Sequence, residues 1–219
     1  MSIKILIADD HEAARLGIRY VIDNMKSDIE IVAEATNGRR AVEMVAQLQP
    51  DIVIMDIGMP ELNGIEAARK IKQDHPRIKI IALTIYRRKP MIVDMLKAGV
   101  SGYILKDNIS ETLPVAIKTI GTDEIYLCPE INRVIAGDYV NGTLPGTRNT
   151  APSDLAPRER EILQLLVEGH NTKQAAQYLG LSVKTIESTR SRIMKKLAIY
   201  NLAELTKYAI REGVTTFDY

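Results

Sequence analysis

Apolar residues in the first half of the chain form short unbroken runs, and these alternate with segments of helical periodicity. Unbroken runs of this kind are typical of strands that are covered on both faces by helices. They predict strands at residues 3–8, 29–35, 52–55, 78–83 and 102–105. The intervening periodicity predicts helices at residues 12–25, 39–48, 64–74, 91–98 and 110–121. In the first helix, the residues expected to face the sheet are Leu16, Ile18, Tyr20, Val21 and Ile22. The pattern indicates an α/β fold with a doubly wound, five-stranded parallel sheet.

Beyond residue 122 the strand pattern fades and only helical periodicity remains. Residues 123–152 become rich in Gly, Pro, Thr and Asn, which predicts a linker that contains one short helix at residues 129–139. Residues 153–219 predict a small all-α domain, with helices at 157–168, 172–179, 183–197 and 202–211. The second and third of these are joined by a short turn and carry small alanines, as in a helix-turn-helix. We therefore expect two domains, at residues 1–122 and 153–219.

Polar residues stand at the ends of four of the predicted strands. Asp9 and Asp10 follow the first strand, Asp56 the third, Thr84 the fourth and Lys106 the fifth. Parallel strands bring their carboxyl ends to one edge of the sheet, so these side chains are expected to converge. Three carboxylates with a loop carbonyl suit Mg²⁺, while a hydroxyl and an ammonium suit a bound oxyanion. This set of residues predicts phosphoryl acceptance on Asp56.

Charge is unevenly distributed along the chain. The net charge is +1, but residues 1–154 hold 19 Lys and Arg against 21 Asp and Glu, whereas residues 155–219 hold 10 against 7. The helix predicted at residues 183–197 carries cationic and hydroxyl side chains in one stripe. Basic residues near a helix C-terminus also offset its dipole, but the continuous stripe favours a helix in the major groove of double-stranded DNA. The residues expected to contact DNA phosphates or base edges are Lys184, Thr185, Glu187, Ser188, Ser191, Arg192, Lys195 and Lys196.

Cysteine and histidine are too few or too scattered to predict a further site. Cys128 is the only cysteine, which excludes an intrachain disulfide, and we expect it to pack as a small apolar residue. We expect His11, His75 and His170 at surface or loop positions, without a catalytic or metal cluster. No signal peptide and no apolar run long enough to span a membrane is found, so we expect a cytoplasmic protein.

Four motifs occur in an order that identifies a family: ADD at residues 8–10, MDIGMPELNG at 55–64, ALT at 82–84 and GYILKD at 102–107. Residues 1–121 resemble the flavodoxin-like receiver domain of two-component response regulators. The resemblance implies that Asp56 takes a phosphoryl group from a sensor histidine kinase and that Thr84 and Lys106 hold the phosphoryl oxygens. It implies that Tyr103 changes rotamer as a switch. The implied ligands of Mg²⁺ are Asp9, Asp10, Asp56 and the carbonyl of Gly58.

A second resemblance covers residues 155–212, which read LAPREREILQLLVEGHNTKQAAQYLGLSVKTIESTRSRIMKKL from Leu155 to Leu197. This segment resembles the LuxR-type helix-turn-helix domain, and the whole chain is similar to response regulators of the NarL/FixJ type. The resemblance implies a transcription regulator that binds paired DNA half-sites as a homodimer when phosphorylated. Two positions depart from the usual pattern of this domain: Ala156 stands where Thr or Ser is usual, and Thr189 stands where His is usual. The first should remove a helix cap, and the second should alter backbone contact or site preference.

Other classes of protein fit the residues less well. A phosphatase with an aspartate nucleophile needs a general acid two residues further on, where this chain has Gly58. A flavodoxin-like FMN protein needs a first loop rich in Ser, Thr or Gly, in place of Asp9 and Asp10. A regulator that binds DNA without phosphorylation, and uses its receiver for protein contacts, remains the alternative. We expect a phosphoacceptor that is not an enzyme, apart from catalysing its own dephosphorylation.

Overall fold

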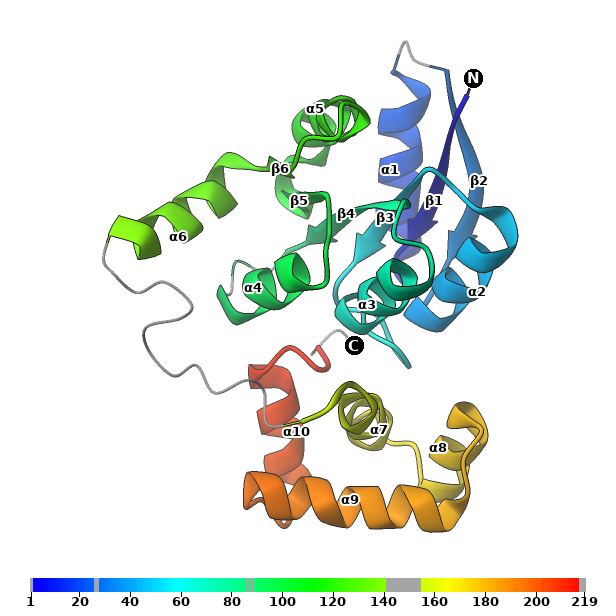
Figure 1. Cartoon of the computed structure of the whole chain (residues 1–219), viewed down its shortest axis with the longest axis vertical. Helices are drawn as coiled ribbons and strands as arrows, with labels where there is room; N and C mark the ends of the chain where they lie inside the picture. Colours follow the sequence, from blue (N-terminus) through cyan, green and yellow to red (C-terminus); the bar gives the residue numbers. More distant parts are fainter. Residues whose placement is uncertain (1, 26–27, 86, 88, 141–154, 217–219) are drawn as a thin grey trace. The chain divides into compact units, whose positions relative to one another are not determined.

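The computed structural model describes residues 2–25, 28–85, 87, 89–140 and 155–216 (Figure 1). The chain divides into two compact units, at residues 1–141 and 142–219. Unit 1 contains a parallel sheet with strand order β2-β1-β3-β4-β5-β6, which confirms the doubly wound α/β prediction and adds one strand to it. The strands are β1 (Ile3–Ala8), β2 (Ile29–Ala35), β3 (Ile52–Asp56), β4 (Lys79–Thr84), β5 (Gly102–Leu105) and β6 (Tyr126–Leu127).

Helices cover both faces of the sheet, as the unbroken apolar runs require (Figure 1). One face packs against α1 (Glu12–Asp23) and α5 (Ile109–Gly121), and α5 follows a short 3₁₀ helix, η1 (Lys106–Asn108). The other face packs against α2 (Gly38–Leu48), α3 (Gly64–Asp74) and α4 (Lys89–Lys97). In β3, Ile54 joins the first core and Val53 the second, so this strand is buried on both sides.

The helix α1 buries a narrower face than its sequence pattern predicts. Ile18, Val21 and Ile22 are buried against the sheet, as expected. Leu16 and Tyr20 were expected on the same face, but they are 58% and 72% exposed. The apolar stripe on α1 is therefore wider than the surface that the sheet offers to it.

Residues 123–140, which were predicted to begin the linker, form part of unit 1. Strand β6 pairs with Gly102 and Tyr103 of β5. The short helix predicted at residues 129–139 is confirmed as α6 (Pro129–Val140), which packs Ile131 into the core and contacts α4. Cys128 is buried in the same core, as predicted. The rest of the predicted linker, residues 141–152, lies outside the described residues.

Unit 2 is the predicted all-α domain. Its helices are α7 (Pro157–Val167), α8 (Thr172–Leu179), α9 (Val183–Leu197) and α10 (Leu202–Arg211), and they share one apolar core. The α8–α9 turn uses Gly180 in the left-handed region, with φ of 62°, where glycine is favoured. Ser182 then caps α9 by accepting a hydrogen bond from the Thr185 N–H. The helix-turn-helix is thus present at the predicted place.

Gly64 begins α3 where the backbone of the preceding loop folds back behind Asp56. A Cβ atom at residue 64 would lie 2.0 Å from the Asp56 carbonyl oxygen, so either α3 or β3 would have to move. We expect Gly64→Ala to lower the free energy of unfolding by about 2 kcal/mol or more. Gly17→Ala is the matched control, because nothing lies within 4 Å of its Cβ position. Gly17→Ala should raise the free energy of unfolding, measured in urea, by about 0.5–1 kcal/mol, because alanine favours the helical conformation of α1. Equal effects of the two substitutions would contradict the close approach at Gly64.

Candidate functional site

Asp56 is held at the rim of the sheet by the loop that follows β3. The Ile57 N–H donates to Asp56 Oδ1 over 2.8 Å, and the Gly64 N–H donates to the Ile57 carbonyl over 3.0 Å. The Asn63 side chain caps α3 by accepting from the Glu66 N–H. This folded loop leaves the Asp56 side chain only 6% exposed. A buried carboxylate therefore stands at the carboxyl end of β3, as its sequence position predicts.

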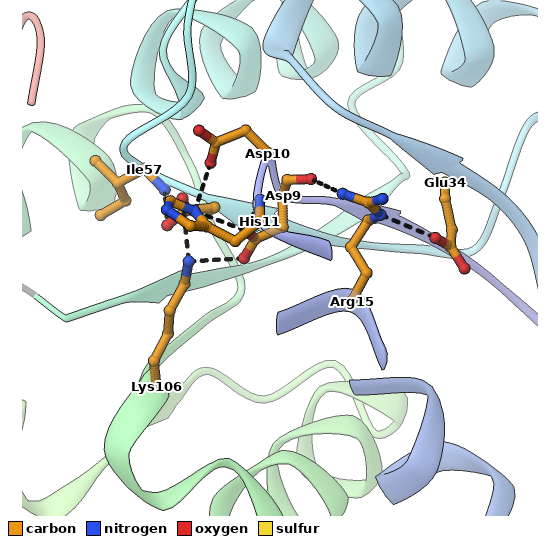
Figure 2. Close-up of polar contacts among 8 residues, drawn as sticks. Asp9, Asp10, His11, Arg15, Glu34, Ile57 and Lys106 are labelled. Atoms are coloured by element: carbon orange, nitrogen blue, oxygen red, sulfur yellow. Dashed lines mark hydrogen bonds and ion pairs between the residues drawn. The ribbon is translucent and has the colours of Figure 1, made fainter. Parts of the chain in front are cut away.

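The ammonium group of Lys106 lies between two of the predicted carboxylates. Lys106 Nζ is 2.7 Å from Asp9 Oδ2 and 3.2 Å from Asp56 Oδ2. The Asp9 side chain is fully buried, and its Oδ1 accepts a hydrogen bond from the His11 N–H over 2.9 Å. Figure 2 shows Lys106 reaching up from the start of η1 toward β1. The structure thus brings Asp9, Asp56 and Lys106 together, although they lie far apart in the sequence.

His11 belongs to the same cluster, contrary to the prediction that the histidines take no part in one. Its Nδ1 lies 2.9 Å from Asp10 Oδ1 and 3.5 Å from Asp9 Oδ1 (Figure 2). Ligand atoms of Asp9, Asp10, His11 and Asp56 all lie within 4.8 Å of one another. His11 directly follows the two aspartates, so its place in the sequence was the available signal. The described part of the chain therefore holds three carboxylates and an imidazole in one small volume.

Three further residues of the predicted site lie on β4, on β5 and in the loop after β3. Thr84 ends β4, directly after the residue that pairs with Asp56, and it is fully buried. Tyr103 is fully buried on β5 opposite Ala82, and its hydroxyl has no hydrogen-bond partner among the residues that the structure describes. Gly58 lies buried in the bend that follows β3. The roles implied for these three residues remain predictions.

Burial and charge act in opposite directions at this site. Burial, opposed by Lys106 and reinforced by Asp9 and Asp10, raises the pKa of Asp56 to about 6. Burial alone would lower the pKa of Lys106, but the charges of Asp56 and Asp9 outweigh it and hold that pKa above its ordinary value. Lys106 therefore stays charged, and the cluster still carries more negative charge than this one ammonium can balance.

A second polar network, which the sequence analysis missed, holds the start of α1 against β1 and β2. Arg15 Nη1 donates to the Asp9 carbonyl over 3.0 Å, and Arg15 Nε donates to Glu34 Oε2 over 2.9 Å (Figure 2). Burial by itself would raise the pKa of Glu34, but Arg19 and Arg15 outweigh burial and hold that pKa below its ordinary value. The network fixes the backbone of Asp9 from the side opposite to its carboxylate. Only three-dimensional proximity reveals it, because Arg15 and Glu34 share no motif.

The α9 residues that were predicted to contact DNA all lie on the exposed surface of unit 2. They form the predicted stripe of Lys184, Thr185, Glu187, Ser188, Ser191, Arg192, Lys195 and Lys196. Two of the predictions about this helix change. Lys196 Nζ lies 2.7 Å from Glu159 Oε2, so it is paired within the unit. Thr189 is buried, with 7% exposure, so its side chain packs inside the unit, where a base or phosphate does not reach it.

The start of α7 shows how the missing cap at Ala156 is compensated. The Ala156 side chain cannot accept a hydrogen bond, but its N–H donates to Glu159 Oε2 over 2.9 Å. This is one half of a capping box. Glu159 is itself buried, and burial pushes its pKa upward. Hydrogen bonds from Lys196 and from the Ala156 N–H outweigh that effect and hold the pKa of Glu159 below its ordinary value.

Comparison with known proteins identifies the class to which this fold and site belong. The family model described as the response regulator receiver domain matches residues 5–118. The model described as bacterial regulatory proteins, luxR family, matches residues 153–209. The chain therefore belongs to the response regulators that join a receiver domain to a DNA-binding LuxR-type helix-turn-helix domain.

Individual relatives cover nearly the whole chain. Oxygen regulatory protein NreC of Staphylococcus carnosus is 36% identical over 98% of this chain and 100% of its own length. NreC of Staphylococcus aureus is 35% identical over the same shares. Among solved structures, RcsB of Salmonella enterica serovar Typhimurium, bound to promoter rprA with phosphomimetic BeF₃⁻, is 27% identical. It covers 95% of this chain and 98% of its own, with a TM-score of 0.61. A structure of two RcsB dimers on two parallel DNAs is 25% identical over 97% of this chain and 99% of its own, with a TM-score of 0.60.

No helix in the described part of the chain combines the length and the apolar character needed to cross a bilayer.

The raised pKa of Asp56 predicts a pH-dependent stability. Below its ordinary value of 3.8 the group is protonated in both the folded and the unfolded state. As the pH rises through about 6, the folded protein must ionise a buried carboxyl group and loses the stability that protonation provided. We expect Asp56→Asn, measured by urea unfolding in EDTA, to be more stable than wild type by about 2–3 kcal/mol at about pH 8. The two proteins should differ little at about pH 3.5. A difference that does not change with pH would contradict this account.

Proposed function

We propose that the chain is a transcriptional response regulator that is switched by phosphorylation of Asp56. The supporting observation is the meeting of Asp9, Asp10, Asp56 and Lys106 at one edge of the sheet. A carboxylate oxygen of Asp56 would attack the phosphorus of a phosphohistidine on a partner kinase. The new O–P bond replaces the N–P bond, and the kinase imidazole is released. Lys106 would then offset the added negative charge, and the hydroxyl of Thr84, at the end of β4, would donate to a phosphoryl oxygen.

The same residues fit a divalent metal ion. Three carboxylates face a single ammonium group, and ligand oxygens of Asp9, Asp10 and Asp56 lie within 4.8 Å of one another. Hard oxygen ligands of this kind suit Mg²⁺, which keeps several of its waters. We propose that Asp9, Asp10, Asp56 and the Gly58 carbonyl hold it. Bound there, the ion would neutralise negative charge on the carboxylates and on the incoming phosphoryl group.

For the output of the switch, we propose that phosphorylation favours a homodimer whose two α9 helices contact paired DNA half-sites. The solved RcsB structure with two dimers on DNA supports this for a relative with the same two domains. In this chain the exposed stripe on α9 supports it, because cationic and hydroxyl groups share one surface suited to the major groove. We propose Tyr103 as the residue that changes rotamer in the switch. Its buried hydroxyl has no partner in the described part of the chain, so an alternative position can offer it a hydrogen bond.

Binding of Mg²⁺ should be visible as a stabilisation of the unphosphorylated protein. At an ion concentration tenfold above its dissociation constant, the wild type should gain about 1.4 kcal/mol in the free energy of unfolding. Asp10→Asn should lose most of this gain, because it removes one carboxylate from the cluster. Asp51→Asn is the matched control: this aspartate is exposed and precedes β3 at its other end. Equal gains in wild type and Asp10→Asn would argue against the proposed ion site.

Phosphorylation should require Asp56 and change the assembly of the protein. Wild type and Asp51→Asn, incubated with acetyl phosphate and Mg²⁺, should each gain one phosphoryl group in their intact mass. Their dimer fraction in sedimentation and their affinity for DNA should rise, the affinity by about fivefold or more. Asp56→Asn should show none of these changes. If DNA affinity and dimerisation were the same in wild type and Asp56→Asn, the chain would instead be a DNA-binding regulator that works without phosphorylation.

A further inference from the structure

Two buried carboxylates lie on α7, and they have different ion-pair partners. The side chains of Glu159 and Glu161 are 5% and 4% exposed. Glu161 Oε2 is 2.6 Å from Arg158 Nη1 on the same helix, and Arg158 Nη2 donates to the Leu179 carbonyl at the end of α8 over 2.8 Å. Glu159 instead reaches Lys196 on α9. The helix α7 is therefore joined to α9 by an ion pair and to α8 by a hydrogen bond from Arg158.

Glu159 makes three contacts with its two oxygens. Its Oε2 accepts from the Ala156 N–H over 2.9 Å and from Lys196 Nζ over 2.7 Å. Its Oε1 lies 3.9 Å from Arg192 Nη1, which is one helical turn before Lys196. One desolvated carboxylate thus joins the start of α7 to the last turns of α9. A buried carboxylate that loses its cation is strongly unfavourable, so the pairing restrains α9 along its own axis.

We propose that Glu159 is a positioning residue for DNA binding and that Lys196 serves this tie and not a DNA phosphate. To reach a phosphate, the Lys196 ammonium would have to leave the buried Glu159 carboxylate, which would keep only the Ala156 N–H and the more distant Arg192 guanidinium. Arg192, which is 61% exposed and only loosely associated with Glu159, remains available to the DNA. The inference rests on the proposed contact between α9 and DNA, and it refines the list of contacting residues.

Two explanations of Glu159 predict effects of opposite sign. If the carboxylate merely reduced the positive charge of the DNA-facing surface, its removal would strengthen DNA binding and steepen the salt dependence. If it positions α9, its removal weakens sequence-specific binding although the unit becomes more positive. Likewise, Lys196→Gln would lower the salt slope by about 0.9 for each bound subunit if Lys196 contacted a phosphate, and would leave the slope unchanged if it does not.

The experiment uses the full chain and a duplex that wild-type protein selects from a random-sequence pool, with a scrambled duplex for comparison. Fluorescence anisotropy over a series of KCl concentrations gives both affinities and the salt slope. We expect Glu159→Gln and Lys196→Gln each to weaken binding to the selected duplex by about fivefold to tenfold. Both should reduce the ratio of selected to scrambled affinity. The double variant should be no weaker than the single variants, because the two residues act as one pair.

Glu161→Gln is the matched control, because it removes an equally buried carboxylate from the same helix, and that carboxylate pairs with Arg158 of α7 and not with a cation of α9. Glu161→Gln should lower the free energy of unfolding, but it should change the ratio of selected to scrambled affinity much less than Glu159→Gln does. All variants are compared at a temperature where circular dichroism shows them to be folded. Unchanged or tighter binding by Glu159→Gln, or a salt slope lowered by Lys196→Gln, would overturn the inference. If the wild type itself selected no duplex, the proposed DNA contact would fail first, which separates the two proposals.

Discussion

Repulsion between carboxylates is the constraint on which unit 1 depends. The sheet topology places the tips of β1 and β3 side by side, so Asp9, Asp10 and Asp56 must lie close together whatever their charges favour. Lys106 offsets this repulsion from the start of η1, but burial, with smaller contributions from Asp9 and Asp10, still raises the pKa of Asp56. Any ligand that adds positive charge, or any change that moves Lys106, must therefore alter the stability of the folded state as well as its chemistry. Stability and switching are linked through one electrostatic balance.

Unit 2 handles a buried carboxylate in a different way. In unit 1 the acids outnumber the nearby cation, whereas Glu159 is met by Lys196 and approached by Arg192. The pKa of Glu159 is accordingly lowered, and the pair behaves as a structural tie. Both cases depend on desolvation, which makes the number of compensating charges decisive. An excess of acid suits a group that must accept an incoming cation or phosphoryl group, and a balanced pair suits a fixed helix.

The sequence was sufficient to predict the parallel sheet, the helix-turn-helix and the strand-tip residues Asp9, Asp10, Asp56, Thr84 and Lys106. These follow from apolar periodicity and from the rule that parallel strands end at one edge. Strand β6 was missed because two residues are too short to show a strand pattern. Three features could not be predicted. The exposure of Leu16 and Tyr20 depends on how much surface the neighbouring sheet offers to α1. The position of His11 beside Asp10 and the pairing of Glu159 with Lys196 depend on side-chain contacts that form only in the folded chain. Periodicity along one element carries no information about either.

Strand β6 has a consequence for the behaviour of the protein at high local concentration. Without it, β5 would present an unpaired strand edge beside Tyr103, and such edges recruit strands from other molecules. A paired edge of only two residues leaves little to extend, and Pro129 follows soon after and lacks the N–H that a further ladder needs. Two chains brought together on adjacent stretches of DNA would thus meet with this side of the sheet protected against aggregation.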